Sequence, residues 1–340
     1  IIEAFAGRFA ITVAASGTAS LTATPGTIDI AAAGTVSGVT AVVLNGAAGI
    51  TSEGTLLAGT LSGGSSAGGA SLTGSSQVTA LGNFAVNTDL VLDDAAGLLV
   101  SGVVGGTNVT LSGPTVDITG TVDAGGTARI TATTGAITLS GALSGATAVV
   151  LNGATGVSGA GVLTAGKFSG GSALGSVFLS GANQVSTLGD FSVAQTFLLF
   201  DATGLAVTGT ITAANIGLVT TTGGLALSGV LNAGPGIVLL NAVGGVNQSG
   251  GSIVAGSLTS SGVTGNVVLG STTNAIDALD GFTVTSGSFA LTDGSPLSVG
   301  GTVKVDDGRA NTLRSDGFTF ATGGALKTDV TGVVSLIPLT

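Results

Sequence analysis

The chain has 340 residues, 62 of them Gly, and it contains no Cys, His, Met, Trp or Tyr. Hydrophobic residues make up 44% and charged residues only 7%, the reverse of a disordered composition, so we expect an ordered protein. Without His and Cys it lacks the commonest general base, thiol nucleophile and zinc ligands, which excludes most enzyme classes. The formal net charge of −10 provides no basic surface for phosphates, so we expect no nucleic-acid partner.

Membrane and targeting signals are also not evident. The longest apolar runs, such as Phe197 to Phe200, are far shorter than a membrane helix requires, so we expect no transmembrane segment. No basic-then-apolar signal segment is visible. Because the chain begins at Ile1 and not at Met, we interpret it as a mature or excised piece of a longer protein.

A Leu-Gly-x-Phe motif occurs three times along the chain. Each copy leads to an Asp and then to an alternating apolar run that ends in Gly. In chain order the copies are residues 81–84 with Asp94 and run 98–102, residues 188–191 with Asp201 and run 205–209, and residues 279–282, with Asp and Gly exchanged, followed by Asp293 and run 297–301. These copies predict a repeat protein, whose core grows along one axis and whose function belongs to a long regular surface.

The spacing of the copies sets the expected organisation. Phe84 and Phe191 are 107 residues apart, whereas Phe191 and Phe282 are 91 apart, so the third copy is shorter by about one structural unit. We expect a single solenoid over 1–340, with long repeats at about 26–134, 135–236 and 237–303. Residues 304–340 are predicted to form charged, atypical terminal coils, because terminal repeats usually differ from the others.

Within each long repeat a shorter unit is visible. Val100 is echoed by Ile118 after 18 residues, and Leu205 by Leu225 after 20 residues. Each unit contains two or three short runs with period-two alternation, separated by Gly, Asn, Ser or Asp, which indicates short strands and tight corners.

These features predict an all-β fold, a right-handed parallel β-helix of roughly 16 coils and about 80 Å long, with handedness taken from the preference of parallel crossovers. Small or branched aliphatic residues would stack inside the coils, and Gly or Asn would form the corners. The alternative is an array of antiparallel β-sandwich modules of roughly 100 residues each, which explains the 107-residue spacing but not the 18- to 20-residue echoes.

The Gly-, Ala-, Thr- and Val-rich coils, the recurring Leu-Gly-x-Phe motif and the Gly-Gly-Val-x-Gln segment at 244–248 resemble repeats of filamentous haemagglutinin-type adhesins. These are exoproteins of bacterial two-partner secretion and are similar to autotransporter passengers. The resemblance covers about residues 20–305 and implies a right-handed β-helical shaft, secreted across the outer membrane and displayed at the cell surface. The amino-terminal secretion domain and the carboxy-terminal membrane barrel that such systems use are not seen in this sequence.

Four groups of residues have a possible chemical role. Asp94, Asp201 and Asp293 occupy equivalent repeat positions, and because calcium requires six to eight oxygens we interpret them as Asx-type corners and not as calcium ligands. The recurring Phe residues favour a buried aromatic stack over a sugar-binding surface.

An ice-binding surface would need Thr-x-Thr pairs at every coil, but pairs such as Thr131 and Thr133 do not recur in this way. Acids scattered at corners, with few cations, do not favour polysaccharide cleavage; we expect no enzyme, no cofactor and no metal.

Charge gathers near the carboxy terminus, and a β-helix without a cap exposes unpaired backbone groups at both ends. One interpretation is a solvated set of terminal coils. The other is an end-to-end interface between copies of the chain, formed by Glu3, Arg8, Lys304, Asp306, Asp307, Arg309, Arg314, Asp316, Lys327 and Asp329.

The sequence therefore predicts a bacterial extracellular or cell-surface β-helical shaft with a structural and adhesive role. Its expected partner is a host or neighbouring-cell surface or matrix. The alternative is a subunit of a self-assembling extracellular filament that stacks end to end.

Overall fold

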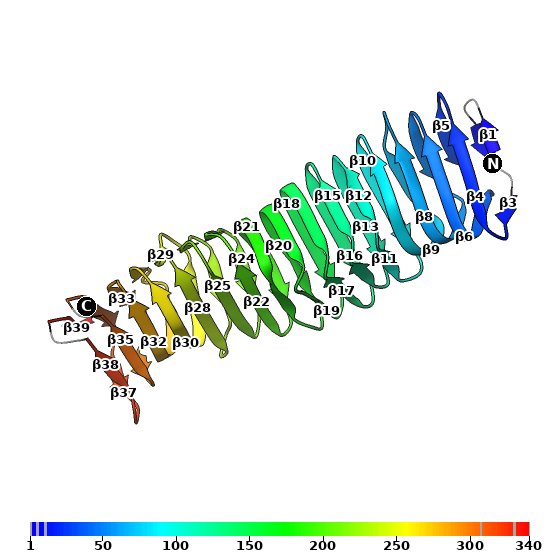
Figure 1. Cartoon of the computed structure of the whole chain (residues 1–340). Helices are drawn as coiled ribbons and strands as arrows, with labels where there is room; N and C mark the ends of the chain where they lie inside the picture. Colours follow the sequence, from blue (N-terminus) through cyan, green and yellow to red (C-terminus); the bar gives the residue numbers. More distant parts are fainter. Residues whose placement is uncertain (1, 5–6, 10–11, 307, 329–330, 340) are drawn as a thin grey trace. The chain divides into compact units, whose positions relative to one another are not determined.

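The computed structural model describes all residues except 1, 5–6, 10–11, 307, 329–330 and 340. For residues 2–4 and 7–9 it describes the backbone but not the side chains. It contains two compact units, residues 1–166 and residues 167–340. In the described residues the secondary structure is all β, without a helix, and forms a parallel β-solenoid of about 16 turns (Figure 1). The predicted fold class is confirmed, and the alternative of antiparallel sandwich modules is wrong.

The first unit consists of strands of 3 to 17 residues. They are β1 (Ile2–Ala4), β2 (Gly7–Phe9), β3 (Thr12–Ala15), β4 (Thr18–Ala23), β5 (Thr27–Ile30), β6 (Thr35–Gly46), β7 (Gly49–Ser52), β8 (Thr55–Ser65), β9 (Ala70–Val86), β10 (Asp89–Asp94), β11 (Leu98–Val100), β12 (Val103–Gly106), β13 (Asn108–Gly113), β14 (Val116–Ile118), β15 (Thr121–Ala124), β16 (Thr127–Ala132), β17 (Ala136–Leu139), β18 (Ala142–Gly153) and β19 (Gly156–Gly159). Strand β20 (Val162–Ser172) contains the boundary between the units.

The second unit is also built from parallel strands. Its further strands are β21 (Val177–Val193), β22 (Thr196–Asp201), β23 (Leu205–Val207), β24 (Thr210–Thr212), β25 (Asn215–Thr220), β26 (Leu225–Leu227), β27 (Val230–Asn232), β28 (Ile237–Val243), β29 (Val246–Gln248), β30 (Ser252–Thr264), β31 (Val267–Leu269), β32 (Ala275–Thr285), β33 (Phe289–Thr292), β34 (Leu297–Val299), β35 (Thr302–Val305), β36 (Ala310–Ser315), β37 (Phe318–Phe320), β38 (Ala325–Lys327) and β39 (Val333–Pro338).

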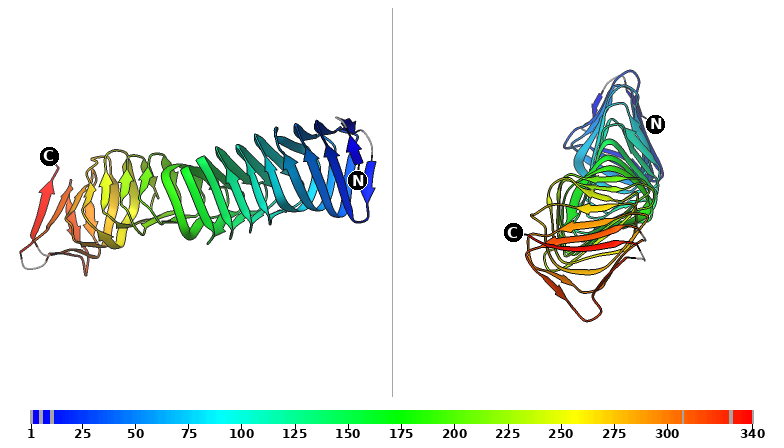
Figure 2. Two further views of the ribbon diagram at one scale, coloured as in Figure 1. Left: turned by 45° about the horizontal axis from the view of Figure 1, so that its top comes forward. Right: turned by 90° about the vertical axis from the view of Figure 1, so that its left-hand side faces the viewer.

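Three strands make one turn of the solenoid. In the first unit β13 pairs with β16, β14 with β17 and β15 with β18, always in parallel and one turn apart. Each turn therefore presents a parallel strand segment on each of three sides of the solenoid, although a long strand such as β18, which pairs with both β15 and β16, supplies two of these segments. Figure 2 shows strands of successive turns lying side by side. The echoes seen in the sequence are these pairings, because Val100 pairs with Ile118 and Leu205 with Leu225.

The core consists of columns of aliphatic side chains that repeat turn after turn. One column of the first unit, in register on neighbouring strands and with no exposed surface, is Leu72, Leu92, Leu111, Ile130 and Leu151. Leu199, Leu218 and Leu240 form a comparable column in the second unit. Full burial of one such side chain contributes about 1.5–3 kcal/mol, so each turn is stabilised mainly by its two neighbours.

The Leu-Gly-x-Phe motif forms a bulge at a corner of the turn. Leu81 pairs with Leu61, but Phe84 pairs with Gly63, so β9 carries one extra residue relative to β8. Asn83 at the bulge accepts a hydrogen bond from the backbone N–H of Val103 in the next turn, at 2.9 Å. Gly63 is required here, because its φ is 126° and a Cβ would lie 1.9 Å from a backbone oxygen.

The second and third copies show why the motif tolerates an exchange of Asp and Gly. Asp190 of the second copy accepts from the N–H of Thr210 in the next turn, at 2.8 Å. In the third copy Gly281 has a φ of 73°, and Asp280 instead accepts from the hydroxyl of Ser257 in the preceding turn, at 2.8 Å. The carboxylate connects neighbouring turns in both arrangements, but in opposite directions along the chain.

The recurring Phe residues are buried, as predicted. Phe84, Phe191 and Phe282 are 1%, 3% and 0% exposed. The ring of Phe191 lies 4.8 Å from that of Phe168 and 4.7 Å from that of Phe197, measured between centroids. These rings fill the corner that the bulge opens.

We predict that Phe191→Ala lowers the free energy of unfolding by about 3–5 kcal/mol, because it leaves a cavity beside two other rings. The matched control is Phe178→Ala, since Phe178 is 43% exposed, and this change should cost well under half as much. Urea denaturation followed by circular dichroism measures both. Equal losses for the two variants would show that the corner cluster contributes nothing special.

Candidate functional site

The last turn of the second unit stands out because its inward side chains are uncovered. Its strands β37, β38 and β39 pair with β34, β35 and β36 of the turn before. Phe320 lies in register with Val299 and Leu336 with Leu313. The inner partners are fully buried, whereas Phe320 is 48% and Leu336 43% exposed. The column of core side chains therefore reaches the surface at this turn, where unpaired strand edges can accept another strand.

The described charged residues of the predicted end-to-end interface near this turn lie on β35, β36 and β38 and at the corners beside them. Lys304 and Lys327 are exposed and occupy the same register position on β35 and β38. Asp306 accepts a hydrogen bond from the N–H of Ser286 at 2.6 Å, which ties it to a corner. Exposed positions are also held by Arg309, Arg314 and Asp316. Asp307 and Asp329 lie outside the described residues.

The amino-terminal residues of that prediction lie on the first turn of the first unit. Glu3 on β1 is in register with Thr22, and Arg8 on β2 is in register with Asp29. The side chains of Glu3 and Arg8 lie outside the described part of the structure. The backbone of this turn pairs with β4, β5 and β6.

The three repeated Asp residues are buried corner residues. Both carboxylate oxygens of Asp94 accept backbone hydrogen bonds, from Ala96 two residues later at 3.2 Å and from Val78 in the preceding turn at 2.7 Å. Asp201 and Asp293 accept in the same two ways, from residues two positions later and from the turn before. The predicted Asx-type corner is confirmed. The bond to the preceding turn, which follows from the stacking of turns, was not predicted.

Burial has an electrostatic consequence at two of these positions. It raises the pKa of the Asp94 and Asp293 carboxyls from the ordinary 3.8 to about 6, against backbone hydrogen bonds that lower it. A carboxyl whose pKa is higher in the folded than in the unfolded state binds more protons when folded. Its stabilising contribution is therefore fully present below about pH 4 and is lost as the pH rises through about 6.

We predict that the double variant Asp94→Asn/Asp293→Asn flattens the decrease in stability between pH 4 and pH 7. A pKa difference of this size corresponds to about 3 kcal/mol per carboxyl, so the change should be visible in urea midpoints measured at each pH. The exposed Asp123→Asn is the control for removal of a negative charge and should follow the wild-type profile. An unchanged slope in the double variant would contradict the assignment.

A buried polar network accompanies the third Asp and was missed by sequence reasoning. The side-chain amides of Gln248 and Asn274, 7% and 1% exposed, bond each other in both directions at 2.9 and 3.0 Å. Asn274 also accepts from the N–H of Ile253 at 2.8 Å. The only available signal was that Asn183 and Asn274 are 91 residues apart, the same spacing as Phe191 and Phe282. The network satisfies the backbone N–H of Ile253 and the carbonyl oxygen of Thr292.

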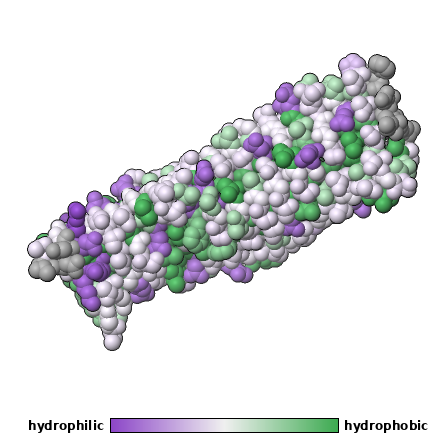
Figure 3. Space-filling view, viewed as in Figure 1, coloured by the Kyte–Doolittle hydropathy of each residue, from purple (hydrophilic) through white to green (hydrophobic). Residues whose placement is uncertain are grey.

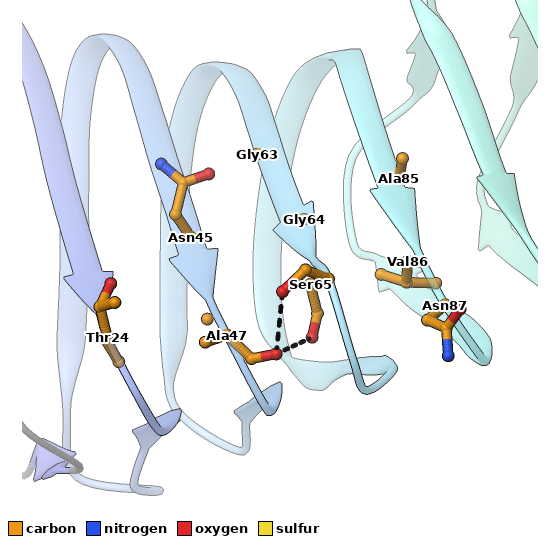
Figure 4. Close-up of a pocket in the computed structure, with 12 residues that line it drawn as sticks. Thr24, Asn45, Ala47, Gly63, Gly64, Ser65, Ala85, Val86 and Asn87 are labelled. Atoms are coloured by element: carbon orange, nitrogen blue, oxygen red, sulfur yellow. Dashed lines mark hydrogen bonds between the residues drawn. The ribbon is translucent and has the colours of Figure 1, made fainter.

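The first unit has a surface groove of about 590 Å³ at the corner of three to four turns (Figure 4). Gly63 and Gly64 form its floor, where a Cβ would lie 1.9 Å from a backbone oxygen of a neighbouring turn. The hydroxyls of Ser65 and Ser66 donate to the carbonyl oxygen of Ala47 at 3.5 and 3.3 Å. The groove thus marks close backbone approach at a corner, where the hydroxyls of Ser65 and Ser66 already have a partner.

Comparisons with known proteins do not add a family to this description. No protein-family profile, no curated protein and no solved structure matches the chain. Within the described ranges no group of three or more acidic residues is placed to hold a metal ion. The same part of the chain has no helix long and apolar enough to cross a membrane. Fold and repeats define the chain as a parallel β-solenoid repeat protein.

Proposed function

We propose that the chain is a non-enzymatic shaft segment of a bacterial cell-surface or secreted adhesin of the filamentous haemagglutinin type. The observation that carries this proposal is the register of consecutive turns within each unit, in which backbone hydrogen bonds and aliphatic columns follow the same direction. Such a structure resists extension and bending because each turn is held by its neighbours. The absence of Cys is compatible with export in an unfolded state, since no disulfide has to form before the protein folds.

The extracellular location and the adhesive role rest on the resemblance of the repeats to adhesins exported by two-partner secretion. The expected partner is a host or neighbouring-cell surface or its matrix. The exposed Ser, Thr and Asn side chains along the turns offer many hydroxyls and amides to such a surface, with few charges.

We predict that beads coated with the chain adhere to host cells or to extracellular matrix several-fold more than albumin-coated beads. Soluble chain added as a competitor should reduce this adhesion, because it occupies the same partner. Microscopy with bead counting measures the effect. Adhesion no greater than that of albumin, or turnover of a polysaccharide by the purified chain, would contradict the proposal.

A second candidate function is favoured by the last turn of the second unit. Its uncovered core column, with Phe320 and Leu336 at the surface, could be covered by the first turn of another copy, which would give an extracellular filament. Parallel strands would then continue from one copy into the next. Lys304 and Lys327 would form part of the rim of this contact.

We predict that, if this candidate holds, Phe320→Asp/Leu336→Asp abolishes fibres seen by electron microscopy, because each carboxylate would have to be buried in the contact. Val268→Asp is the matched control, since Val268 is 42% exposed but lies on β31, away from the last turn. Wild-type chain that forms no fibres at high concentration would exclude the filament and leave the shaft proposal untouched.

A further inference from the structure

An apolar surface covers the outward side of one sheet in the second unit. It consists of six residues on β21, β22, β25 and β28, here called the apolar face: Phe178, Leu198, Phe200, Val219, Ile237 and Leu239. Figure 3 shows a hydrophobic area where these strands lie in Figure 1. The face is regular, because its residues occupy neighbouring positions of the parallel register.

The apolar face is open to solvent. Phe178 is 43% and Ile237 47% exposed, and the other four residues are partly exposed. The rings of Phe178 and Phe200 meet edge to face, with centroids 6.5 Å apart. Leu198 lies across Gly217, where a Cβ would come within 2.5 Å of its side chain. Glycine at this position therefore leaves room for the side chain of Leu198 to lie against the sheet.

The fold does not require apolar residues at these positions. In the first unit the equivalent outward positions, on β9, β10, β13 and β16, are Ser71, Val91, Asp93, Ser112, Thr127 and Arg129. Five of these six are polar or charged, and Asp93 accepts from the hydroxyl of Ser112 at 2.5 Å. The first unit thus keeps a wettable surface on the same scaffold. The apolar residues of the second unit need an explanation other than folding.

The chemistry around the apolar face indicates what it binds. Asn215 at its edge accepts from the N–H of Ile237 at 3.0 Å. The amide of Asn241 donates to Ser261 at 2.9 Å and accepts from it at 3.0 Å. These polar groups are engaged within the protein and leave little to recognise sugar hydroxyls. The six positions include no Lys or Arg to attract anionic lipid.

A second copy of the chain is the partner that these properties favour. The net charge of the chain is −10, so two copies repel each other over most of their surfaces. The apolar face carries no charge, which makes it a place where two copies can approach without opposing carboxylates. Flat sheets pack face to face at about 10 Å through interleaved side chains.

The size of the face sets the strength of such a contact. A rectangle that encloses the six residues, four strands about 4.8 Å apart and about five residues of 3.3 Å, measures roughly 300 Å² per copy. It also includes Thr196, Asn215, Gly217 and Asn241. A pair would bury roughly 600 Å², well below the 1,200–2,000 Å² of stable complexes. We therefore expect a weak and reversible contact, with a dissociation constant on the order of 100 µM.

We propose that the apolar face pairs with the same face of a second copy, so that two chains associate side by side through a two-fold contact. This lateral pairing is independent of the end-to-end candidate and of the adhesive role. It uses the outward side of one sheet, whereas the end-to-end contact would use the last turn.

Sedimentation velocity of the full chain from about 10 to about 500 µM tests the proposal, a range chosen to span the expected dissociation constant. The sedimentation coefficient of the wild type should rise with concentration and persist in 1 M salt, since the contact is apolar. Phe178→Ser/Phe200→Asp installs the residue types of the first unit and should abolish the rise. Leu239→Arg, the residue type found at position 129, should do the same and provides a second variant if the first does not fold.

Leu174→Ser is the matched control, because Leu174 is 68% exposed in the same unit but outside the face, and it should associate as the wild type does. A wild type that stays monomeric throughout, or face variants that associate normally, would overturn the proposal. Monomeric chain that binds neutral phosphatidylcholine vesicles through these residues would also overturn it and assign the face to lipid. Loss of association in Phe320→Asp/Leu336→Asp, but not in the variants of the apolar face, would show that the chains associate through their ends.

Discussion

Parallel hydrogen bonding in register between consecutive turns is the constraint on which the rest of each unit depends. Once the strands of one turn pair with those of the next, each inward side chain packs against the side chain at the equivalent position one turn away. An inward residue therefore packs against its counterparts in the turns on either side, and most inward positions are aliphatic. This explains why Leu, Val and Ile repeat along the columns and why so much of the sequence is Gly, Ala, Ser and Thr.

Corners are where this regularity has a cost. A bulge or a change of sheet leaves backbone N–H groups without a strand partner, and a buried unpaired group costs about 1–3 kcal/mol. Short side chains accept hydrogen bonds from such N–H groups. Asn83 and Asp190 accept from the next turn, and Asp94 accepts from the preceding turn. Carboxylates are therefore part of the stacking itself. At Asp94 and Asp293 burial raises the pKa of the carboxyl, which couples its protonation to stability.

Outward positions obey no comparable constraint, and the two units use that freedom differently. Position 93 is Asp in the first unit, where it bonds Ser112, while the equivalent position in the second unit is Phe200. Both side chains stand on the same backbone arrangement. In a solenoid the binding properties of a surface can thus change without changing the fold, because side chains outside the columns contribute little to stability.

The sequence by itself determined the β-solenoid, the echoes between successive turns, the burial of Phe84, Phe191 and Phe282, and the corner role of the repeated Asp residues. These are local or periodic properties, and repetition makes them readable in one chain. Only the tertiary structure decided which residues of different turns meet: the bond from Val78 to Asp94, the Gln248–Asn274 pair, and the gathering of Phe178, Phe200 and Leu239 on one surface. The reason is that turns differ in length and bulges shift the register, so the partner of a residue depends on every corner between them.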